Sequence, residues 1–403
     1  MSSDVSTSLP RVALIGVSGY GTIYHQLLRT AVKERRVKFV AAVIINPAQV
    51  TEAVAELQTG GTVIYTSAEE LFAKEAGKID LCMIPTGIQW HARLTIAALN
   101  AGMNVLVEKP LAGSLADTAA MREAEAATGR WVAVGFQDVY ALEARRLKER
   151  LLSGAIGRLH EIRMVGLWPR PRAYFARNHW AGRIEADGAA VLDSPLNNAF
   201  AHFVNLGLFF AGPTAVTSAS LRIDSAELLR AHPIEMFDTA VIRGASPEGV
   251  RFWLGFSHAT RETRQPEIYL EGDAGSVEWH HEEQCVIIAA DGRRETIPLP
   301  DAVACRETMF TLVLSRLRDP ATFICTTAIA EQHVRLIEAV QSSGKIRTIA
   351  DEFIDWLPNA STGDETPAVR GLEAALERAM HQDSPLSSVV SLTRAPSVAP
   401  LAR

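Results

Sequence analysis

The first third of the chain alternates short apolar runs with amphipathic stretches. The runs RVALIGV, KFVAAVII, IDLCMIPT and NVLVEK are nearly continuous in aliphatic residues, and each precedes a stretch whose apolar residues recur with helical spacing. Strands that are apolar on both faces and alternate with helices are typical of a parallel sheet covered on each side. From residue 11 to about residue 138 the pattern therefore predicts a doubly wound α/β domain.

The pattern changes after a predicted linking helix at residues 141–154. The later strand-like runs mostly follow one another through turn signals, which is typical of an antiparallel sheet. We expect an α+β domain with a large, mostly antiparallel open sheet, a long helix over Ser194–Ala211 and another helix near 326–342. The clearest of these runs are GRLHEIRMVGLW, AVTSASLRI, TAVIRGA, RFWLGFSHAT, PEIYLEG, GSVEWHHE and CVIIAADGRRETIPL.

These patterns divide the chain into four parts. We expect a flexible N-terminus (1–10), the α/β domain (11–150), the α+β domain (151–345) and a C-terminal extension (346–403). The extension carries one amphipathic stretch, AVRGLEAALERAMHQ, and a Ser/Pro/Ala-rich end for which we expect mobility.

Composition excludes several classes of protein. Of the 403 residues 48% are apolar and 21% charged, with a formal charge of −6, which favours a globular protein without a nucleic-acid or membrane partner. The start lacks the basic and apolar regions of a signal peptide, so we expect a cytoplasmic protein. The four cysteines show no CxxC spacing and no cluster has metal-ligand spacing, which predicts reduced thiols and no metal site.

A glycine-rich turn, LIGVSGYG, joins the first strand to the first helix. Gly16 and Gly21 match the first and third glycines of the dinucleotide fingerprint, Ser18 stands at the second, and Gly19 and Tyr20 complete the turn. Such glycines permit a tight turn and place the helix N-terminus at a pyrophosphate. Because the turn opens a series of βα units, we predict a Rossmann domain that binds a dinucleotide.

The end of the second strand favours NAD over NADP. Asn46 occupies the position at which an acidic residue usually binds the adenosine ribose. Its amide can hydrogen-bond a 2′-hydroxyl, and no Arg or Lys follows closely enough to bind a 2′-phosphate. We expect NAD as the cofactor, with NADP left open.

Taken in order, GVSGYG, IPTGIQWHARLTIAALNAGMNVLVEKP and VGFQ resemble the glucose–fructose oxidoreductase / inositol dehydrogenase / MocA (Gfo/Idh/MocA) family. The likeness is strongest over residues 11–140 and extends more loosely to about 345. It implies hydride transfer between nicotinamide and a secondary hydroxyl of a sugar, cyclitol or glycoside. It also implies a homodimer or homotetramer formed through the sheet of the second domain.

Carried over residue by residue, the resemblance places Lys109 at the substrate hydroxyl and Glu108 near the nicotinamide ribose. Four further residues are expected along the cofactor channel or beside the nicotinamide: Pro85, Thr86, His91 and Gln137.

The family's second-domain motif is only partly present. The family pattern is an Asp followed four residues later by a His, whereas this chain has Asp193 and then Asn197. An amide cannot act as a general base at neutral pH. We expect Asp193, together with His202 or Lys109, to carry the substrate proton away. The alternative is that Asp193 and Ser194 only cap a helix.

The helix expected from Ser194, with Pro195 at its first position, is apolar almost all round. It nevertheless carries Asn198, His202 and Asn205 in a narrow stripe. Buried polar groups need partners, so this stripe either forms a structural hydrogen-bond network or faces a ligand. The second possibility would let His202 replace the missing family histidine.

A segment rich in aromatic residues and arginines, WPRPRAYFARNHWAG, precedes that helix. Aromatic faces and forked donors suit a sugar ring or an acidic sugar, although packing or dimerisation would use the same residues. The candidates for substrate binding are Trp168, Arg170, Tyr174, Arg177, Asn178, Trp180, Asn198 and, after the strand RFWLGF, His258.

Three functions stay open. The resemblance favours an NAD(P)-dependent oxidoreductase that acts on CH–OH groups of a small sugar-like molecule. A redox-neutral glycosidase or lyase that passes through a keto-sugar is the second, and a catalytically silent nucleotide-binding sensor or regulator is the third.

Overall fold

The computed structural model describes residues 8–358 and 362–392. The chain forms two compact units, one of residues 1–141 and 302–331 and the other of residues 142–301 and 332–403. The expected flexible segments fall mostly at residues 1–7 and 393–403, which lie outside the described residues. Pro10, also expected to be flexible, is instead buried, and its carbonyl accepts a hydrogen bond from the N–H of Lys38 at 2.8 Å.

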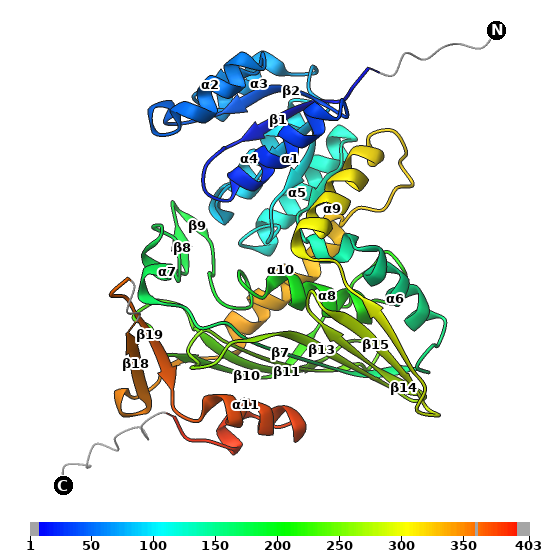
Figure 1. Ribbon diagram of the computed structural model, residues 1–403, viewed down its shortest axis with the longest axis vertical. Coiled ribbons are helices and arrows are strands. Elements are labelled where there is room, and N and C mark those ends of the chain that lie inside the picture. Colours follow the sequence, from blue (N-terminus) through cyan, green and yellow to red (C-terminus); the bar gives the residue numbers. More distant parts are fainter. Residues whose placement is uncertain (1–7, 359–361, 393–403) are drawn as a thin grey trace. The chain divides into compact units, whose positions relative to one another are not determined.

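The first unit contains a six-stranded sheet in the order β3-β2-β1-β4-β5-β6. Every pairing in it is parallel, and the strands are flanked by helices (Figure 1). The predicted doubly wound domain is confirmed. The strands are β1 (Arg11–Ile15), β2 (Lys38–Val43), β3 (Val63–Tyr65), β4 (Leu81–Ile84), β5 (Asn104–Val107) and β6 (Val132–Val134).

The helices of this unit follow the predicted order, with one addition from late in the sequence. Helix α9 (Ala302–Arg316) packs against the short helix η2 (Gln137–Tyr140). Apolar spacing predicts a helix but not the domain it packs on, which is why the linear division placed residues 302–331 in the second domain. The other helices are α1 (Gly21–Lys33), η1 (Pro47–Gln49), α2 (Thr51–Thr59), α3 (Ala68–Glu75), α4 (Ile88–Asn100) and α5 (Leu115–Thr128).

The second unit is built on a nine-stranded mixed sheet, in the order β16-β15-β14-β13-β7-β12-β11-β10-β17. Two pairings, β7 with β12 and β10 with β17, are parallel, and the others are antiparallel. This confirms the predicted large, mostly antiparallel sheet. The strands are β7 (Leu159–Leu167), β10 (Arg222–Arg230), β11 (Thr239–Ala245), β12 (Arg251–Ser257), β13 (Arg264–Gly272), β14 (Gly275–His280), β15 (Gln284–Ala289), β16 (Arg294–Pro298) and β17 (Ile346–Thr348).

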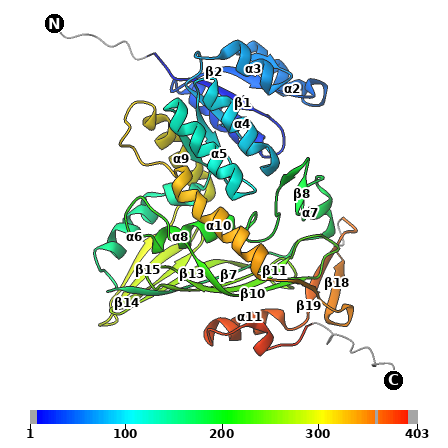
Figure 2. The ribbon, with the colours of Figure 1, turned by 180° about the vertical axis from the view of Figure 1, so that it is seen from behind.

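Helices lie on both faces of this sheet. Figures 1 and 2 show α6 (Leu142–Leu152) and α8 (Ala201–Ala211) on one face and α11 (Leu372–His381) on the other. The linking helix α6, which the linear division assigned to the first domain, thus belongs to the second unit. The remaining elements are α7 (Arg172–Ala176), β8 (Glu185–Ala186), β9 (Ala189–Ala190), α10 (Thr327–Ser343), η3 (Asp351–Phe353), β18 (Ile354–Pro358), β19 (Glu365–Val369) and η4 (Leu386–Ser388).

The predicted helix over Ser194–Ala211 is shorter than expected, because α8 begins only at Ala201. The residues before it form turns in which side chains bond to nearby groups. The Asn197 amide donates to the carbonyl of Val191 at 2.9 Å, and the Asn198 amide donates to Asp193 at 2.8 Å. Such local bonds compete with helix formation.

The C-terminal extension covers part of the open sheet face. Leu372, Leu376 and Ala379 of α11 are at most 1% exposed and belong to the apolar cluster that includes Val165 of β7 and Trp253 of β12. The Trp253 indole N–H also donates to the carbonyl of Ser384 at 3.1 Å. Residues of the C-terminal extension therefore cover this face of the sheet at β7 and β12.

Candidate functional site

The glycine turn between β1 and α1 has the conformation that its residues predict. Gly16 and Gly19 have φ angles of +90° and +57°, which L side chains rarely adopt. A Cβ on Gly21 would lie 2.4 Å from the carbonyl oxygen of Gly16 and 3.6 Å from Cγ of Pro85, which follows β4. The turn is therefore closed against the neighbouring strand end, at the carboxyl edge of the sheet.

The same turn offers backbone donors to an anion. Ser18, Gly19 and Tyr20 are exposed, and within the described part of the chain their N–H groups make no hydrogen bond. Helix α1 carries no acidic residue in its first turn, so no fixed negative charge opposes a phosphate there. Asn46 stands exposed after β2, and its side chain makes no capping bond. These features fit the pyrophosphate and ribose of a dinucleotide.

Replacing Gly21 with alanine tests this fit. The new methyl group would force Gly16 and the start of α1 apart, which displaces the three backbone donors. We expect the affinity for NAD, measured by calorimetric titration, to fall by about tenfold or more. The matched control is Gly129→Ala at the end of α5, a left-handed position with φ of 65° far along the chain from the turn. Unchanged NAD affinity in Gly21→Ala would contradict the assignment.

Lys109 follows β5 at the same carboxyl edge. Its side chain is half-buried, and the peptide bond to Pro110 is cis. The N–H of Glu108 donates to the carbonyl of Ile84 in β4 at 3.0 Å, which extends the parallel pairing up to the charged pair. Lys109 is thus held at the rim formed by the ends of β4 and β5.

Glu108 is turned into the first unit. It is 5% exposed, and Oε1 accepts a hydrogen bond from the Tyr24 hydroxyl at 2.5 Å while Oε2 accepts one from the N–H of Lys109 at 3.0 Å. A Cβ on Gly135 would lie 2.7 Å from Oε1. Burial and the charge of Glu108 raise the pKa of Tyr24 well above its usual value. Sequence reasoning missed Tyr24, whose signal is a tyrosine one helical turn after the last glycine of the turn.

The His91 side chain connects the segments that follow β4 and β5. It is fully buried, with Nδ1 at 2.8 Å from the carbonyl oxygen of Pro110 and Nε2 at 3.1 Å from that of Thr86. Burial lowers the pKa of His91 to about 4, so the ring is neutral at physiological pH and donates to one carbonyl at a time. Its place is beneath the edge, where it positions Thr86 and Pro110. Gln137 in η2 is likewise buried.

In the second unit, Asp193 and Asn197 of the motif each bond to other residues of the segment from Gly182 to Asn198. Asp193 is 2% exposed, and its Oδ2 accepts from the N–H of Gly182 at 2.6 Å while Oδ1 accepts from Asn198. Asn197 is equally buried and bonds to Val191. The structure therefore joins Asp193 to Asn198 by a hydrogen bond, whereas the side chain of Asn197 bonds the backbone at Val191.

The predicted polar stripe is broken by the late start of α8. Asn198 precedes the helix, His202 is half-buried in its first turn, and Asn205 is fully buried. Neither amide atom of Asn205 has a hydrogen-bond partner among the described residues. The hydroxyl of Ser194 also has no hydrogen-bond partner among the described residues, so Ser194 is not the helix cap that the sequence predicted.

The aromatic and arginine-rich segment forms a ladder of stacked groups. The Arg170 guanidinium lies 5.6 Å from the ring centre of Trp168 and 4.7 Å from that of Tyr174. Arg177 lies 3.7 Å from the Tyr174 ring and 5.4 Å from Trp180. The structure thus brings five of the predicted substrate residues together. Asn178 instead stabilises the turn, because its side-chain oxygen accepts from the N–H groups of Trp180 and Ala181.

Two buried histidines anchor the start of this ladder. His258 Nδ1 lies 2.8 Å from the carbonyl oxygen of Trp168, and burial lowers the pKa of His258 to about 3. His232 lies between Asp238, at 2.7 Å from Nδ1, and the carbonyl of Arg170, at 2.8 Å from Nε2. Although burial raises the pKa of Asp238, its hydrogen bonds with His232 hold that pKa below the usual value. Sequence reasoning missed His232 and Asp238, which have no diagnostic spacing.

Substituting these anchors tests whether they position the ladder. His232→Leu removes the bond to the Arg170 carbonyl, whereas His232→Gln keeps a side-chain donor of similar reach. Once a substrate is identified, we expect His232→Leu to raise its KM about tenfold with a smaller change in kcat, and His232→Gln to recover part of that loss. NAD affinity serves as the internal control and stays unchanged. Equal KM values in the wild type and His232→Leu would contradict a positioning role.

All four cysteines are buried and none of them is in a disulfide. Among the described residues, no group of three or more His, Cys, Asp or Glu side chains could hold a metal ion. Within the same residues, no helix is long and apolar enough to cross a membrane.

Two family models match the chain. A model described as an oxidoreductase family with an NAD-binding Rossmann fold matches residues 10–136, and the GFO/IDH/MocA C-terminal domain matches residues 144–278.

Curated relatives match less than half of the chain. The 1-carboxy-3-chloro-3,4-dihydroxycyclohexa-1,5-diene dehydrogenase of Comamonas testosteroni is 32% identical over 161 residues, 39% of this chain and 40% of the relative. An inositol 2-dehydrogenase of Azotobacter vinelandii is 34% identical over 145 residues, 36% of this chain and 42% of the relative. The chain thus spans about two fifths of the length of the curated relatives it matches.

Solved structures show the same fold over more of the chain. The WlbA dehydrogenase from Bordetella pertussis, in complex with NADH and UDP-GlcNAcA, has a TM-score of 0.66 at 22% identity and covers 83% of this chain and 96% of its own. Levoglucosan dehydrogenase, in complex with NADH and levoglucosan, has a TM-score of 0.68 at 17% identity and covers 83% of this chain and 97% of its own.

Proposed function

Because the chain belongs to the Gfo/Idh/MocA family of NAD-binding oxidoreductases, we propose that it transfers a hydride between NAD and a secondary hydroxyl of a small sugar, cyclitol or glycoside. The observation that carries this proposal is the placement of Lys109 at the carboxyl edge of the sheet that also bears the glycine turn. Parallel sheets bind ligands at that edge. The relatives that act on inositol and levoglucosan support the substrate class.

Different residues of the chain bind the cofactor and the substrate. The N–H groups of Ser18, Gly19 and Tyr20 bind the pyrophosphate, and Asn46 bonds the adenosine ribose. Bound NAD supplies the acceptor for the hydride at its nicotinamide ring. Lys109 contacts the substrate hydroxyl and its proton. Glu108 acts through Tyr24 and the backbone of Lys109, which it holds in place.

Lys109 is a better candidate for carrying the substrate proton than Asp193 or Asn197 of the second-unit motif. Both carboxylate oxygens of Asp193 already accept hydrogen bonds from Gly182 and Asn198, and Asn197 cannot take up a proton. We assign to these two residues the shape of the 191–198 loop. His202 stays the alternative proton carrier, and the stacked ladder from Trp168 to Trp180 is assigned to the substrate.

Helix α11 restricts which part of the second-unit sheet is available for the oligomer expected from the resemblance. Since α11 covers the sheet face over β7 and β12, we propose that a dimer or tetramer pairs through the strands that α11 leaves uncovered. Size-exclusion chromatography with light scattering measures this state directly.

A screen of polyols, aldonates and glycosides tests the proposed reaction. The protein is incubated with NAD and each compound while NADH absorbance and sugar release are followed together. We expect at least one polyol or sugar to yield one NADH per oxidised substrate. Sugar release without net NADH would support the redox-neutral reaction instead, and NAD binding without turnover on any compound would support the sensor.

A further inference from the structure

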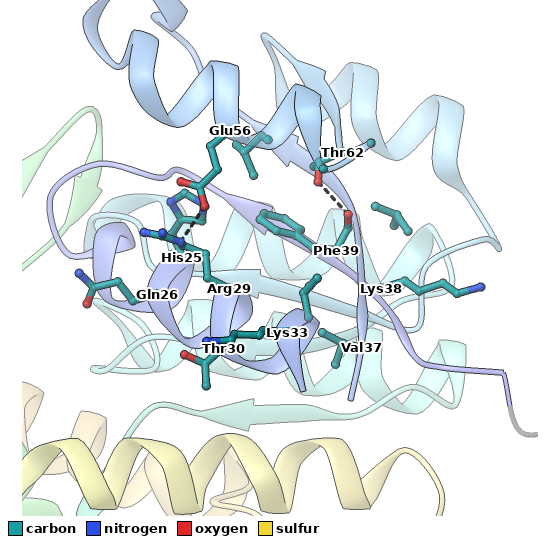
Figure 3. A pocket seen from close by; sticks show the side chains of 15 residues that line it. His25, Gln26, Arg29, Thr30, Lys33, Val37, Lys38, Phe39, Glu56 and Thr62 are labelled. Atoms are coloured by element: carbon teal, nitrogen blue, oxygen red, sulfur yellow. Dashed lines mark hydrogen bonds and ion pairs between the residues drawn. The ribbon is translucent and has the colours of Figure 1, made fainter. Parts of the chain in front are cut away.

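The first unit has a pocket that lies away from the glycine turn. It has a volume of about 750 Å³ and lies between α1, α2 and the first half of β2 (Figure 3). The glycine turn stands at the carboxyl ends of the strands, whereas this pocket is lined by Lys38 and Phe39 at the amino end of β2. Its volume is typical of small-molecule sites.

The floor of the pocket is apolar. Phe39 is only half-buried although it lies on the second strand of the sheet, and Leu57 of α2 lies beside it in the lining. Val32 on α1 remains 43% exposed at the margin. The two helices therefore leave part of the sheet uncovered, and a flat apolar group would remove that surface from water.

The rim is positively charged in a chain of net negative charge. Arg29, Lys33 and Lys38 line the pocket against one carboxylate, Glu56, while the whole chain carries a formal charge of −6. Glu56 is bound to Arg29 at 2.6 Å. The Lys33 ammonium makes no ion pair within the described residues, so the rim retains one uncompensated cation. The Lys38 side chain points away from Phe39, because consecutive strand residues face opposite sides (Figure 3).

One of the lining residues is a buried histidine. His25 lines the pocket and is 6% exposed, and its Nε2 has no hydrogen-bond partner among the described residues. Burial lowers the pKa of His25, with Glu56 opposing and Arg29 reinforcing the effect, so the ring is neutral at physiological pH. The ring meets Phe39 edge-on at 6.1 Å between centres. An unpaired buried nitrogen costs free energy that a ligand can recover.

We propose that this pocket binds a small organic anion with a flat apolar ring and one charged group. The ring lies on Phe39 and Leu57, the charge lies toward Lys33, and a polar atom of the ligand bonds His25. This site is distinct from the cofactor site and does not depend on the reaction proposed above. Helix α1 joins the two, because it carries Gly21 at its start and Lys33 in its last turn.

Calorimetric titration of the full-length protein with 2-naphthoate tests the proposal, with and without saturating NAD. Two further ligands separate its parts: neutral 2-naphthamide keeps the ring without the charge, and octanoate keeps the charge without the ring. We expect saturable binding of one 2-naphthoate per chain that NAD does not displace, and weaker binding of each comparison ligand by about tenfold or more. A parallel titration with 2-naphthyl phosphate shows whether a carboxylate or a phosphate ester is preferred.

Variants locate the binding. Lys33→Gln should weaken 2-naphthoate by about tenfold or more and leave 2-naphthamide unchanged. The matched control is Lys74→Gln, which removes an exposed lysine of the same unit outside the pocket. His25→Leu should weaken 2-naphthoate and 2-naphthamide without lowering the unfolding temperature, which separates a binding role from a structural one. Displacement of 2-naphthoate by NAD, no saturable binding, or equal affinity in Lys33→Gln would overturn the proposal.

Discussion

Replacing Lys109 with alanine should abolish turnover while leaving the cofactor bound. Lys109 is the charged residue at the rim formed by the ends of β4 and β5, whereas the expected pyrophosphate contacts come from backbone N–H groups around Gly19. Losing a group that holds the reacting hydroxyl typically costs about 10²–10⁴ in rate. We therefore expect kcat to fall by about a thousandfold and NAD affinity to change by less than about threefold, measured by NADH absorbance and calorimetry.

The control for this substitution is Lys78→Ala, which removes a lysine that is 58% exposed in the same unit. It should behave as wild type in both measurements. Normal turnover in Lys109→Ala would remove the residue from the mechanism, and loss of NAD binding would show that Lys109 acts on the cofactor instead.

Replacing Lys148 with methionine should cost more stability than any other single change considered for this chain. Lys148 in α6 is fully buried, and its ammonium donates to the carbonyls of Phe209, at 2.6 Å, Phe210, at 3.2 Å, and Gly212. These carbonyls end helix α8, where a cation is favoured. Methionine fills the space but removes the donor from these carbonyls, of which Phe209 keeps only the N–H of Gly212. We therefore expect a loss of about 3–5 kcal/mol in the free energy of unfolding, measured with urea.

The exposed Arg146→Met on the same helix is the matched control and should change stability by less than about 0.5 kcal/mol. The pH dependence gives a second readout. Burial lowers the pKa of Lys148 to about 7, below its unfolded value, so above that pH the unfolded chain binds more protons than the folded one. Stability from this residue therefore increases with pH, and the gap between wild type and Lys148→Met should widen above about pH 7. A gap that narrows would contradict the assignment.

The parts of the fold that were predictable are those with strong local patterns. Continuous apolar strands and the glycine turn predicted the α/β domain and its cofactor edge, because burial on both faces leaves no polar alternation. Strand β10 was expected earlier, over the run AVTSASLRI, whereas it runs from Arg222 to Arg230. Its sequence, RIDSAELLR, alternates weakly because most of its residues are only half-buried.

Long-range packing accounts for what the sequence did not reveal. No spacing in the sequence indicates that α9 returns to the first unit, or that β18 and β19 form a separate pair before α11. The same limit applies to the site. Lys109 and the turn from Gly16 to Gly21 could be proposed from the sequence because their signals are local.

Residues that act through tertiary contacts gave no such signal. Tyr24 bonds Glu108 across 84 residues of sequence, and His232 bonds the Arg170 carbonyl across 62. Glu108 and Asp193, which the sequence indicated as site residues, also bond groups of their own units, a feature that the motifs did not reveal. A sequence motif identifies the residue type at a site, whereas the direction of its side chain depends on the neighbours that packing supplies.

Deuterium transfer tests the central claim most directly. A polyol or sugar that gives NADH in the screen is prepared with deuterium on its carbinol carbon, and the NADH formed is examined by mass spectrometry and proton NMR. Direct hydride transfer predicts one deuterium on the nicotinamide ring of each NADH, and no such product with Lys109→Ala. NADH without deuterium, or a labelled substrate that releases sugar while NAD stays unlabelled and unreduced, would contradict the account.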